Sequence, residues 1–413
     1  MRLFAWTIIG MVGANFAQAQ LRLPGVPQPA LPQKLQTLGT TADNSLAQLA
    51  DLRHLQISRL LRGNPHTVAA DPRGNPIVRE ELLAFAPSEV ALNAALGLGF
   101  RVVREQSIAK LGIRLVVLQP PQTWGLVKAL RRLRESDPNG TYDFNHIYLS
   151  SGSPTAASPT PTPADAGAAV SAKPAGAASR IGLIDSGIEL SHPVFRGTPI
   201  HTWGCASRAV ASAHGTAVAS LLLGQGPGEL YAADVFCGEP TGGAVDVLVK
   251  AFAWLAQLNV AVINVSLVGP DNATLAQIVR ALTSSGYLLV AAVGNDGPAA
   301  PPLYPASYPR VVGVTAVDAH RRVLIEAARG NQVMFAAQGA DMMAADNGGK
   351  YSAVRGTSFA APIVAALLAR ELAAPDTEAS ETAVQELARH AIDLGPPGRD
   401  LTYGYGLVGA EKN

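Results

Sequence analysis

The sequence predicts an α/β fold in which a parallel sheet carries helices on both faces. In the C-terminal half, short and almost uninterrupted apolar segments alternate with longer amphipathic ones. This is the pattern of strands buried on both faces and of the helices that cover them. The chain has 413 residues, of which 48% are hydrophobic and 15% charged, so it can fill a large core. A block with a different order of elements precedes this half, and we therefore expect two folded domains.

The C-terminal domain is expected to cover residues 180–413 and to begin with a short apolar strand that ends in Asp185 and a glycine turn. A helix of small residues follows near His214, and a buried helix starts near Ser358. Between them we predict strands at 230–236, 260–267, 287–293 and 310–317 and helices at 244–258 and 273–284. Because parallel strands end at one edge of a sheet, the polar residues that follow them should gather there.

The N-terminal block, residues 79–148, has the element order β-α-β-β-α-β. The predicted strands are 81–86, 100–108, 112–119 and 142–148, and the predicted helices are 88–98 and 123–135. This order is the ferredoxin-like motif, which predicts a small α+β domain. Many functions share that motif, so a separate binding module is an open alternative for this block.

The remaining segments flank these two domains. Residues 1–19 have the features of a secretory signal peptide: Arg2, an apolar run over 3–12 and the cleavage site Ala17-Gln18-Ala19. A membrane anchor is the alternative, although the run is shorter than the ~20 apolar residues that a span requires. Residues 20–78 are expected to be a partly helical extension, because leucines recur at helical spacing over 43–61. Residues 149–179 are expected to be a linker, since their composition of Ser, Pro, Thr, Ala and Gly cannot bury a core.

Charge and motifs argue against several function classes. Lys and Arg number 32 against 31 Asp and Glu, without a long basic run, which argues against a nucleic-acid partner. No G-x-S-x-G occurs, which argues against an esterase nucleophile elbow. Residues 404–409 match a dinucleotide fingerprint, but only four residues follow, too few for the helix that would hold a pyrophosphate. We expect no cofactor.

Three segments place chemically competent side chains at the ends of predicted elements. Ser358 lies at the start of a buried helix, where free backbone N–H groups favour developing negative charge. His214 opens another helix, and Asp185 ends a strand. Each residue alone is more typical of a helix cap or a turn than of catalysis. Together they supply an acid, a base and a nucleophile in the order Asp, His, Ser.

These segments read D-S-G at 185–187, H-G-T-A-V-A at 214–219 and G-T-S-F-A-A-P at 356–362, and they resemble the subtilisin-like serine proteases. The resemblance implies that Ser358 is the nucleophile and His214 the general base and later acid, with Asp185 orienting the imidazole. A fourth segment, G-N-D-G at 294–297, also matches. It implies that Asn295 donates to the oxyanion together with the Ser358 backbone N–H.

The same resemblance implies a substrate-binding pocket built from two strand ends. Its walls would be Ser266, Leu267, Val268, Gly269, Ala292, Val293 and Gly294. Family members usually carry glycine where this chain has Val268. A β-branched side chain at that position could narrow the pocket, so the substrate preference stays open.

By resemblance, the block 79–148 is a propeptide that assists folding and acts as the intramolecular inhibitor of its own enzyme. We expect self-cleavage just after Tyr148, within a residue or two, because the last strand of such a propeptide runs into the active site. A cut nearer Ala178 is the alternative.

The two cysteines bear on the redox state. Export leads to an oxidising compartment. Cys205 precedes the His214 helix and Cys237 follows a strand, and these elements are neighbours in the family. We therefore expect a disulfide, with two free thiols as the alternative.

The family's calcium loop is reduced here to residues 224–229 with one carboxylate. Because tight calcium binding needs six to eight oxygens, we expect no metal there, while weaker sites elsewhere stay open.

The sequence therefore predicts a secreted, monomeric serine endopeptidase, periplasmic or extracellular, with no membrane span after signal cleavage. It would hydrolyse polypeptides through an acyl-enzyme and would be made as a self-processed precursor. Two alternatives remain: a catalytically silent binding protein on the same fold, and a factor whose only substrate is its own chain.

Overall fold

The computed structural model describes residues 53–150, 153–154, 179–205, 210–226 and 228–410, all within one compact unit, Ser45–Asn413. The expected signal peptide at 1–19, the start of the extension at 20–78 and most of the linker at 149–179 lie outside the described residues. No helix in the described ranges is long and apolar enough to cross a membrane.

A seven-stranded sheet forms the centre of the C-terminal domain. Its order is β15-β14-β13-β11-β8-β10-β9, and every neighbouring pair is parallel. The strands are β8 (Ser179–Asp185), β9 (Ile200–Trp203), β10 (Gly228–Asp234), β11 (Val262–Val265), β13 (Leu288–Ala292), β14 (Val312–Val317) and β15 (Val333–Gln338). This sheet confirms the predicted fold class. The chain passes from one side of β8 to the other, so the end of β8 is a topological switch point, where open α/β sheets bind their ligands.

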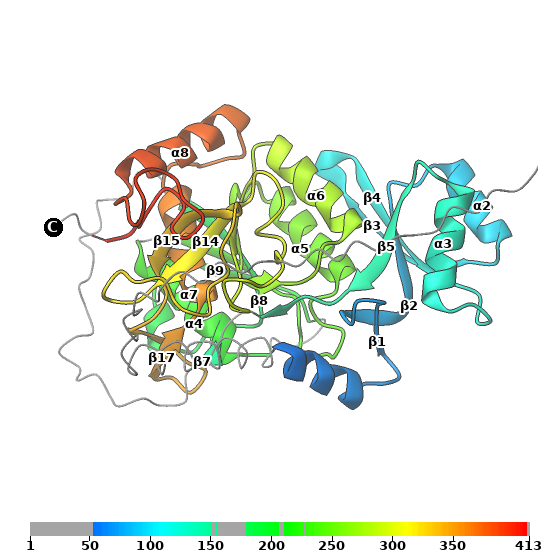
Figure 1. Ribbon diagram of the computed structural model, residues 1–413, viewed down its shortest axis with the longest axis horizontal. Coiled ribbons are helices and arrows are strands. Elements are labelled where there is room, and N and C mark those ends of the chain that lie inside the picture. Colours follow the sequence, from blue (N-terminus) through cyan, green and yellow to red (C-terminus); the bar gives the residue numbers. More distant parts are fainter. Residues whose placement is uncertain (1–52, 151–152, 155–178, 206–209, 227, 411–413) are drawn as a thin grey trace, which may run out of the picture. The chain divides into compact units, whose positions relative to one another are not determined.

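Helices cover both faces of this sheet (Figure 1). Successive side chains of β8 point to opposite faces of the sheet. Leu183 packs in one apolar cluster with α4 (Ala213–Gly224) and α7 (Thr357–Ala369). Ile184 packs in another cluster with α5 (Val245–Gln257) and α6 (Ala273–Ser284). A further helix, α8 (Thr377–His390), contacts α7.

The N-terminal sheet is antiparallel and has the order β5-β2-β4-β3, with β1 on β2. Its elements are β1 (Val68–Ala70), β2 (Pro76–Phe85), α2 (Glu89–Gly97), β3 (Arg101–Ile108), η1 (Ala109–Leu111), β4 (Ile113–Gln119), α3 (Leu126–Ser136) and β5 (Thr141–His146). Alternate residues of β4 face opposite sides: Val116 and Leu118 pack in a cluster with residues of α2 and α3. Leu115 and Val117 pack in the cluster that holds α5 and α6. This sheet therefore lies between its own helices and two helices of the C-terminal domain.

Two expected boundaries fall inside strands, because 78/79 lies within β2 and 179/180 lies within β8. The boundary at 78/79 cuts β2, which begins at Pro76 and pairs with β1, so the antiparallel sheet starts earlier than the sequence indicated. Residues 53–63 are helical, while the start of the helix predicted over 43–61 lies outside the described residues. The expected linker at 149–179 begins with two short strands, β6 (Leu149–Ser150) and β7 (Ser153–Pro154). Strand propensity did not indicate them, because their partners are distant segments of the chain.

Three further short strands lie in the C-terminal domain. β12 (Leu267–Val268) pairs with β6, and β17 (Tyr351–Arg355) pairs with both β16 (Met342–Ala345) and β7. A 3₁₀ turn, η3, covers Pro193–Phe195.

Candidate active site

The predicted acid and base are in direct contact. Asp185 ends β8 and is fully buried, and His214 is the second residue of α4. The Asp185 Oδ1 atom lies 2.8 Å from His214 Nδ1. The same carboxylate oxygen accepts from the backbone N–H and the hydroxyl of Ser186, at 2.6 and 2.9 Å. Three contacts thus fix the carboxylate, and its bond to Nδ1 leaves Nε2 as the ring nitrogen for proton transfer.

A glycine lets α4 approach the end of β8 this closely. An added Cβ on Gly215 would meet the Ser186 carbonyl oxygen at 2.2 Å, closer than any side chain allows. The Gly215 N–H also donates to the Ser186 hydroxyl at 3.1 Å. The H-G-T and D-S-G segments are therefore matched to each other, since each supplies atoms that position the other.

Ser358 is the second residue of α7 and is fully buried. The next residue, Phe359, places its ring 5.4 Å from the His214 ring, which agrees with the packing of α4 against α7. Before the helix, Gly356 has φ 137°, a backbone conformation that favours glycine. The serine thus lies at the helix N-terminus, where the macrodipole favours negative charge.

Pro362 lies inside α7 and not at its first position. Because proline has no N–H, the Ser358 carbonyl loses its helical donor. The Ser266 hydroxyl donates to that carbonyl at 3.3 Å, and Asn264 Nδ2 donates in turn to the Ser266 oxygen at 2.8 Å. The break that Pro362 makes in the helix is thereby filled by a side chain from the end of β11.

Asn295 follows β13, and its side-chain oxygen accepts from the Thr357 N–H at 3.0 Å. That bond fixes the orientation of the amide. Its Nδ2 atom is buried and has no hydrogen-bond partner among the described residues. A buried donor without a partner costs free energy, and a bound group that accepts from Nδ2 would remove that cost.

The residues expected to form the substrate pocket lie at the ends of β11, β12 and β13. Ser266, Leu267, Val268, Ala292 and Val293 are all buried. The Gly294 N–H donates to the Thr357 hydroxyl at 3.2 Å, which ties this wall to the start of α7.

Gly269 forms an isolated bridge with Tyr304, and the space beside it is filled by the ring of Tyr148. The nearest ring atom lies 2.6 Å from the position of an added Cβ. This part of the pocket region is thus occupied by the chain itself.

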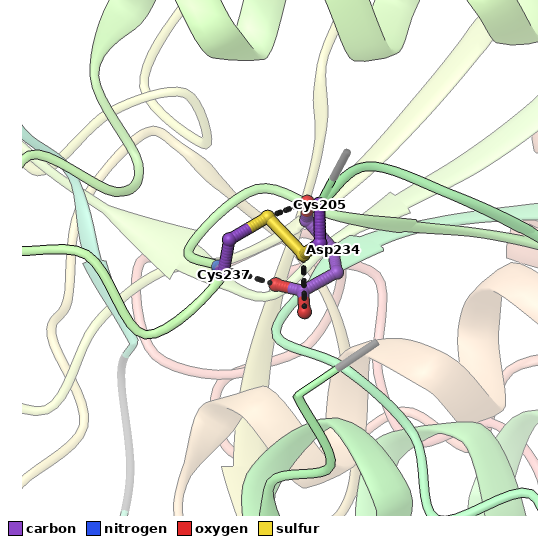
Figure 2. A group of neighbouring side chains, drawn as sticks. All are labelled: Cys205, Asp234 and Cys237. Carbon is purple, nitrogen blue, oxygen red and sulfur yellow. Dashed lines mark hydrogen bonds between the residues drawn. A yellow bond between two sulfur atoms is a disulfide. The ribbon is translucent and has the colours of Figure 1, made fainter. Parts of the chain in front are cut away.

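Cys205 and Cys237 form the expected disulfide, with their Cα atoms 5.2 Å apart. Figure 2 shows the Asp234 carboxylate beside the two sulfurs. Its Oδ1 accepts from the backbone N–H groups of Phe236 and Cys237, at 3.0 and 2.9 Å. The sulfurs and the carboxylate lie within 4.8 Å of one another, but metal binding requires thiolates, and these sulfurs are bonded to each other.

The sequence profile described as the Subtilase family matches residues 176–406, more than half of the chain. The chain belongs to the subtilase family. Its matched region covers Asp185, His214, Asn295 and Ser358, all in the order that the resemblance required.

Individual relatives agree with this family. The chain is 31% identical to subtilisin DY of Bacillus licheniformis over 252 residues, which cover 57% of this chain and 90% of that protein. It is 31% identical to subtilisin amylosacchariticus of Bacillus subtilis subsp. amylosacchariticus over 255 residues, 56% of this chain and 64% of the relative. With the minor extracellular protease Epr of Bacillus subtilis (strain 168) it shares 32% identity over 167 residues, 40% of this chain and only 26% of Epr.

One solved structure shares the fold over a larger part of the chain. Fervidolysin from Fervidobacterium pennivorans, described as a keratinolytic enzyme related to subtilisin, matches with a TM-score of 0.65 at 18% identity. The match covers 80% of this subtilase and 60% of fervidolysin. That share exceeds residues 180–413, so the similarity in fold extends into the N-terminal region.

Sequence reasoning missed several residues that position the site. Ser186 and Thr357 lie inside the quoted motifs, next to Asp185 and Ser358, and this position in the sequence could have identified them. Asn264 had no signal of its own, because it acts through Ser266, whose hydroxyl contacts the remote Ser358.

Proposed function

We propose that this subtilase is a serine endopeptidase that acts through Ser358, His214 and Asp185. The observation that carries the proposal is the buried Asp185–His214 hydrogen bond, at the switch point of the sheet and packed against the start of the Ser358 helix. Serine needs a neighbouring base to become a nucleophile, and the imidazole needs a carboxylate to hold its tautomer.

In the proposed reaction, His214 Nε2 takes the proton of the Ser358 hydroxyl as its oxygen attacks the scissile carbonyl. The Asn295 Nδ2 group and the Ser358 N–H donate to the oxyanion of the tetrahedral intermediate. His214 then gives the proton to the leaving amine, and an acyl-enzyme remains on Ser358. Water repeats the sequence and releases the acid product. Asp185 keeps its charge throughout and stabilises the imidazolium.

We further propose that residues 79–148, together with β1, are the inhibitory propeptide. After β5, Ile147 forms a bridge with Ala244, and β6 then runs antiparallel to β12, with Leu149 opposite Val268 and Ser150 opposite Leu267. An extended segment on this strand blocks a polypeptide substrate from pairing with it. We define residues 147–150 as the exit strand.

The strand pairings support a cut further along the chain than the bond after Tyr148. β6 pairs with β12, whose residues are expected to line the pocket. Ser153 and Pro154 lie opposite Arg355 and Val354, just before the helix that carries Ser358. The proposed cut therefore falls between Ser150 and Ser153. Tyr148 is fully buried upstream, where its hydroxyl donates to the Pro270 carbonyl oxygen at 2.6 Å.

Export by the signal peptide and release into the periplasm or the medium are part of this proposal. The name of Epr, an extracellular protease, and the presence of a disulfide support it. We propose that the mature enzyme acts as a monomer on polypeptides.

Mass spectrometry and casein hydrolysis with the wild type and Ser358→Ala test the proposal. The wild type should yield a fragment that ends between Ser150 and Ser153 and should hydrolyse casein. Ser358→Ala should fold, remain uncut and hydrolyse casein at least about 10⁵-fold more slowly, because the three residues act as a unit. Equal processing or equal hydrolysis in both proteins would reject the assignment of Ser358.

A further inference from the structure

The helix of residues 53–63 contacts the exit strand, although it lies outside the proposed propeptide sheet. Ile57 is 7% exposed and packs in one apolar cluster with Ile147, Leu149 and Ala244. Ala244 belongs to the C-terminal domain, as the N-cap of α5. The helix thus rests on the exit strand and on the surface that receives it.

Arg53, the first residue of this helix that the structure describes, contacts the loop that carries Asn295. Arg53 Nε lies 3.2 Å from the carboxylate of Asp296, and the two side chains are only 15% and 19% exposed. Burial raises the pKa of Asp296, and the charges of Arg53 and His54 oppose that rise. Arg53 therefore places a positive charge beside the mostly buried carboxylate of Asp296, which lies one residue after the proposed oxyanion donor, Asn295.

The other end of the helix is fixed to the N-terminal sheet. The Asn64 N–H and side-chain amide both donate to the Leu60 carbonyl, at 3.1 and 3.0 Å. The Val68 N–H donates to the Asn64 carbonyl at 2.9 Å, where β1 begins. The helix is thus tied to the inhibitory sheet through Asn64 and to the catalytic domain through Arg53.

We propose that residues 53–63 form a second inhibitory element, a strap that holds the exit strand in the substrate cleft after the first cut. The inference rests on the proposed function, because it needs a chain that cuts itself. Leu149 pairs with Val268 and packs in the cluster of Ile57 at the same time. The exit strand can leave only when that cluster opens, and the Arg53–Asp296 pair resists the opening.

The strap predicts that cutting and release are separate steps with different determinants. Removing the Arg53 charge leaves the strands that present the scissile segment unchanged. It also leaves Asp296 partly buried without its cation, which weakens the attachment of the N-terminal fragment. The rate of the first cut should then stay the same while release becomes faster.

The experiment uses full-length wild type, Arg53→Ala and the matched control Arg59→Ala. Arg59 is an exposed arginine of the same helix. Mass spectrometry follows the first cut, native mass spectrometry follows the retained N-terminal fragment, and a fluorogenic peptide follows the appearance of activity. We expect Arg53→Ala to shorten the lag between cut and activity by about tenfold. Arg59→Ala should keep the wild-type lag.

A second variant, Ile57→Ala, removes the apolar contact and should also shorten the lag with the cut preserved. Equal lags in Arg53→Ala, Ile57→Ala and Arg59→Ala, with cutting intact, would overturn the strap and leave the proposed function standing. A wild type that neither cuts itself nor hydrolyses the peptide would overturn the proposed function and the strap with it.

Discussion

The interior of the C-terminal domain and its junction with the N-terminal sheet are built differently. Around α4 and α7 the interior is almost entirely aliphatic or small, and its polar contacts include the Asp185–His214 and Ser266–Ser358 hydrogen bonds. The junction also has an apolar part, but it adds a buried carboxylate of one domain that is paired with an arginine of the other. Asp246, 1% exposed, accepts from Asn145 and Gln106 and forms an ion pair with Arg104 at 2.8 Å.

If the N-terminal sheet is the inhibitor proposed above, this difference explains how one chain can hold it firmly and still release it. Apolar burial makes a permanent core, whereas buried charge pairs add specificity and are lost as a unit when one partner leaves. Asp143 of the N-terminal sheet accepts from the Ala273 N–H at the start of α6, at 2.7 Å. Asp246 is in the first turn of α5. Two helix starts thus contribute to recognition of the N-terminal sheet.

Among the changes that test this comparison, Asn295→Ala should have the largest effect, and it tests whether the interior is built for catalysis. The loss of one oxyanion donor should lower kcat by about 10² to 10³ with little change in KM. Peptide hydrolysis by the mature enzyme measures both constants. Unchanged kcat would mean that Asn295 serves only as a turn residue that accepts from Thr357.

The disulfide tests how far the interior depends on a covalent link. Its loop spans 32 residues, and the double variant Cys205→Ser/Cys237→Ser should lose about 3 kcal/mol of unfolding free energy. Urea denaturation in the Ser358→Ala background avoids autolysis and measures this loss. Equal midpoints with and without the disulfide would show that this covalent link adds nothing to the stability of the domain.

Arg104→Ala tests how much the buried ion pair with Asp246 contributes to the junction. It leaves the carboxylate of Asp246 buried without its cation, so the cut N-terminal fragment should dissociate about 50-fold faster. Arg101→Ala is the matched control, because Arg101 is exposed on the same strand and bonds to Gln119 of the neighbouring strand. Native mass spectrometry of the cut complex gives both rates, and equal rates would show that the junction relies on its apolar part.

The smallest effect concerns the pH dependence of the N-terminal sheet. Burial disfavours the charged form of Asp71, but hydrogen bonds from His146, Asn75 and the Arg73 N–H outweigh it and lower the pKa of Asp71 to about 2. A lowered pKa adds stability above the unfolded value of 3.8, and that stability is lost as the pH falls toward 2.

Asp71→Asn should therefore remove about 2 kcal/mol of stability at pH 5 and have little effect near pH 2. Urea denaturation of Ser358→Ala at both pH values measures the difference, and Glu378→Gln, an exposed carboxylate, is the control. The same loss at both pH values would show that Asp71 contributes through shape and not through charge.

Much of the fold could be predicted because its signals are local. Continuous apolar strands and amphipathic helices follow from side-chain burial, and α6 was placed at its observed bounds. Short strands such as β6, β7 and β12 could not be predicted, because two residues carry no periodicity and their pairing partners lie far away in the chain. The same holds for β1 and the start of β2, which fall within the extension expected at 20–78.

The sequence by itself determined the fold class, the subtilase family and the chemical identity of Asp185, His214, Asn295 and Ser358. These are encoded in contiguous segments whose residue types report their own backbone and chemistry. Three contacts depend on the tertiary structure: the pairing of the exit strand with β12, the ion pair of Arg53 with Asp296, and the hydrogen bond from Ser266 that replaces the donor missing at Pro362. The reason is physical: such contacts join residues roughly 90 to 240 positions apart, and only the packing of buried surfaces brings them together.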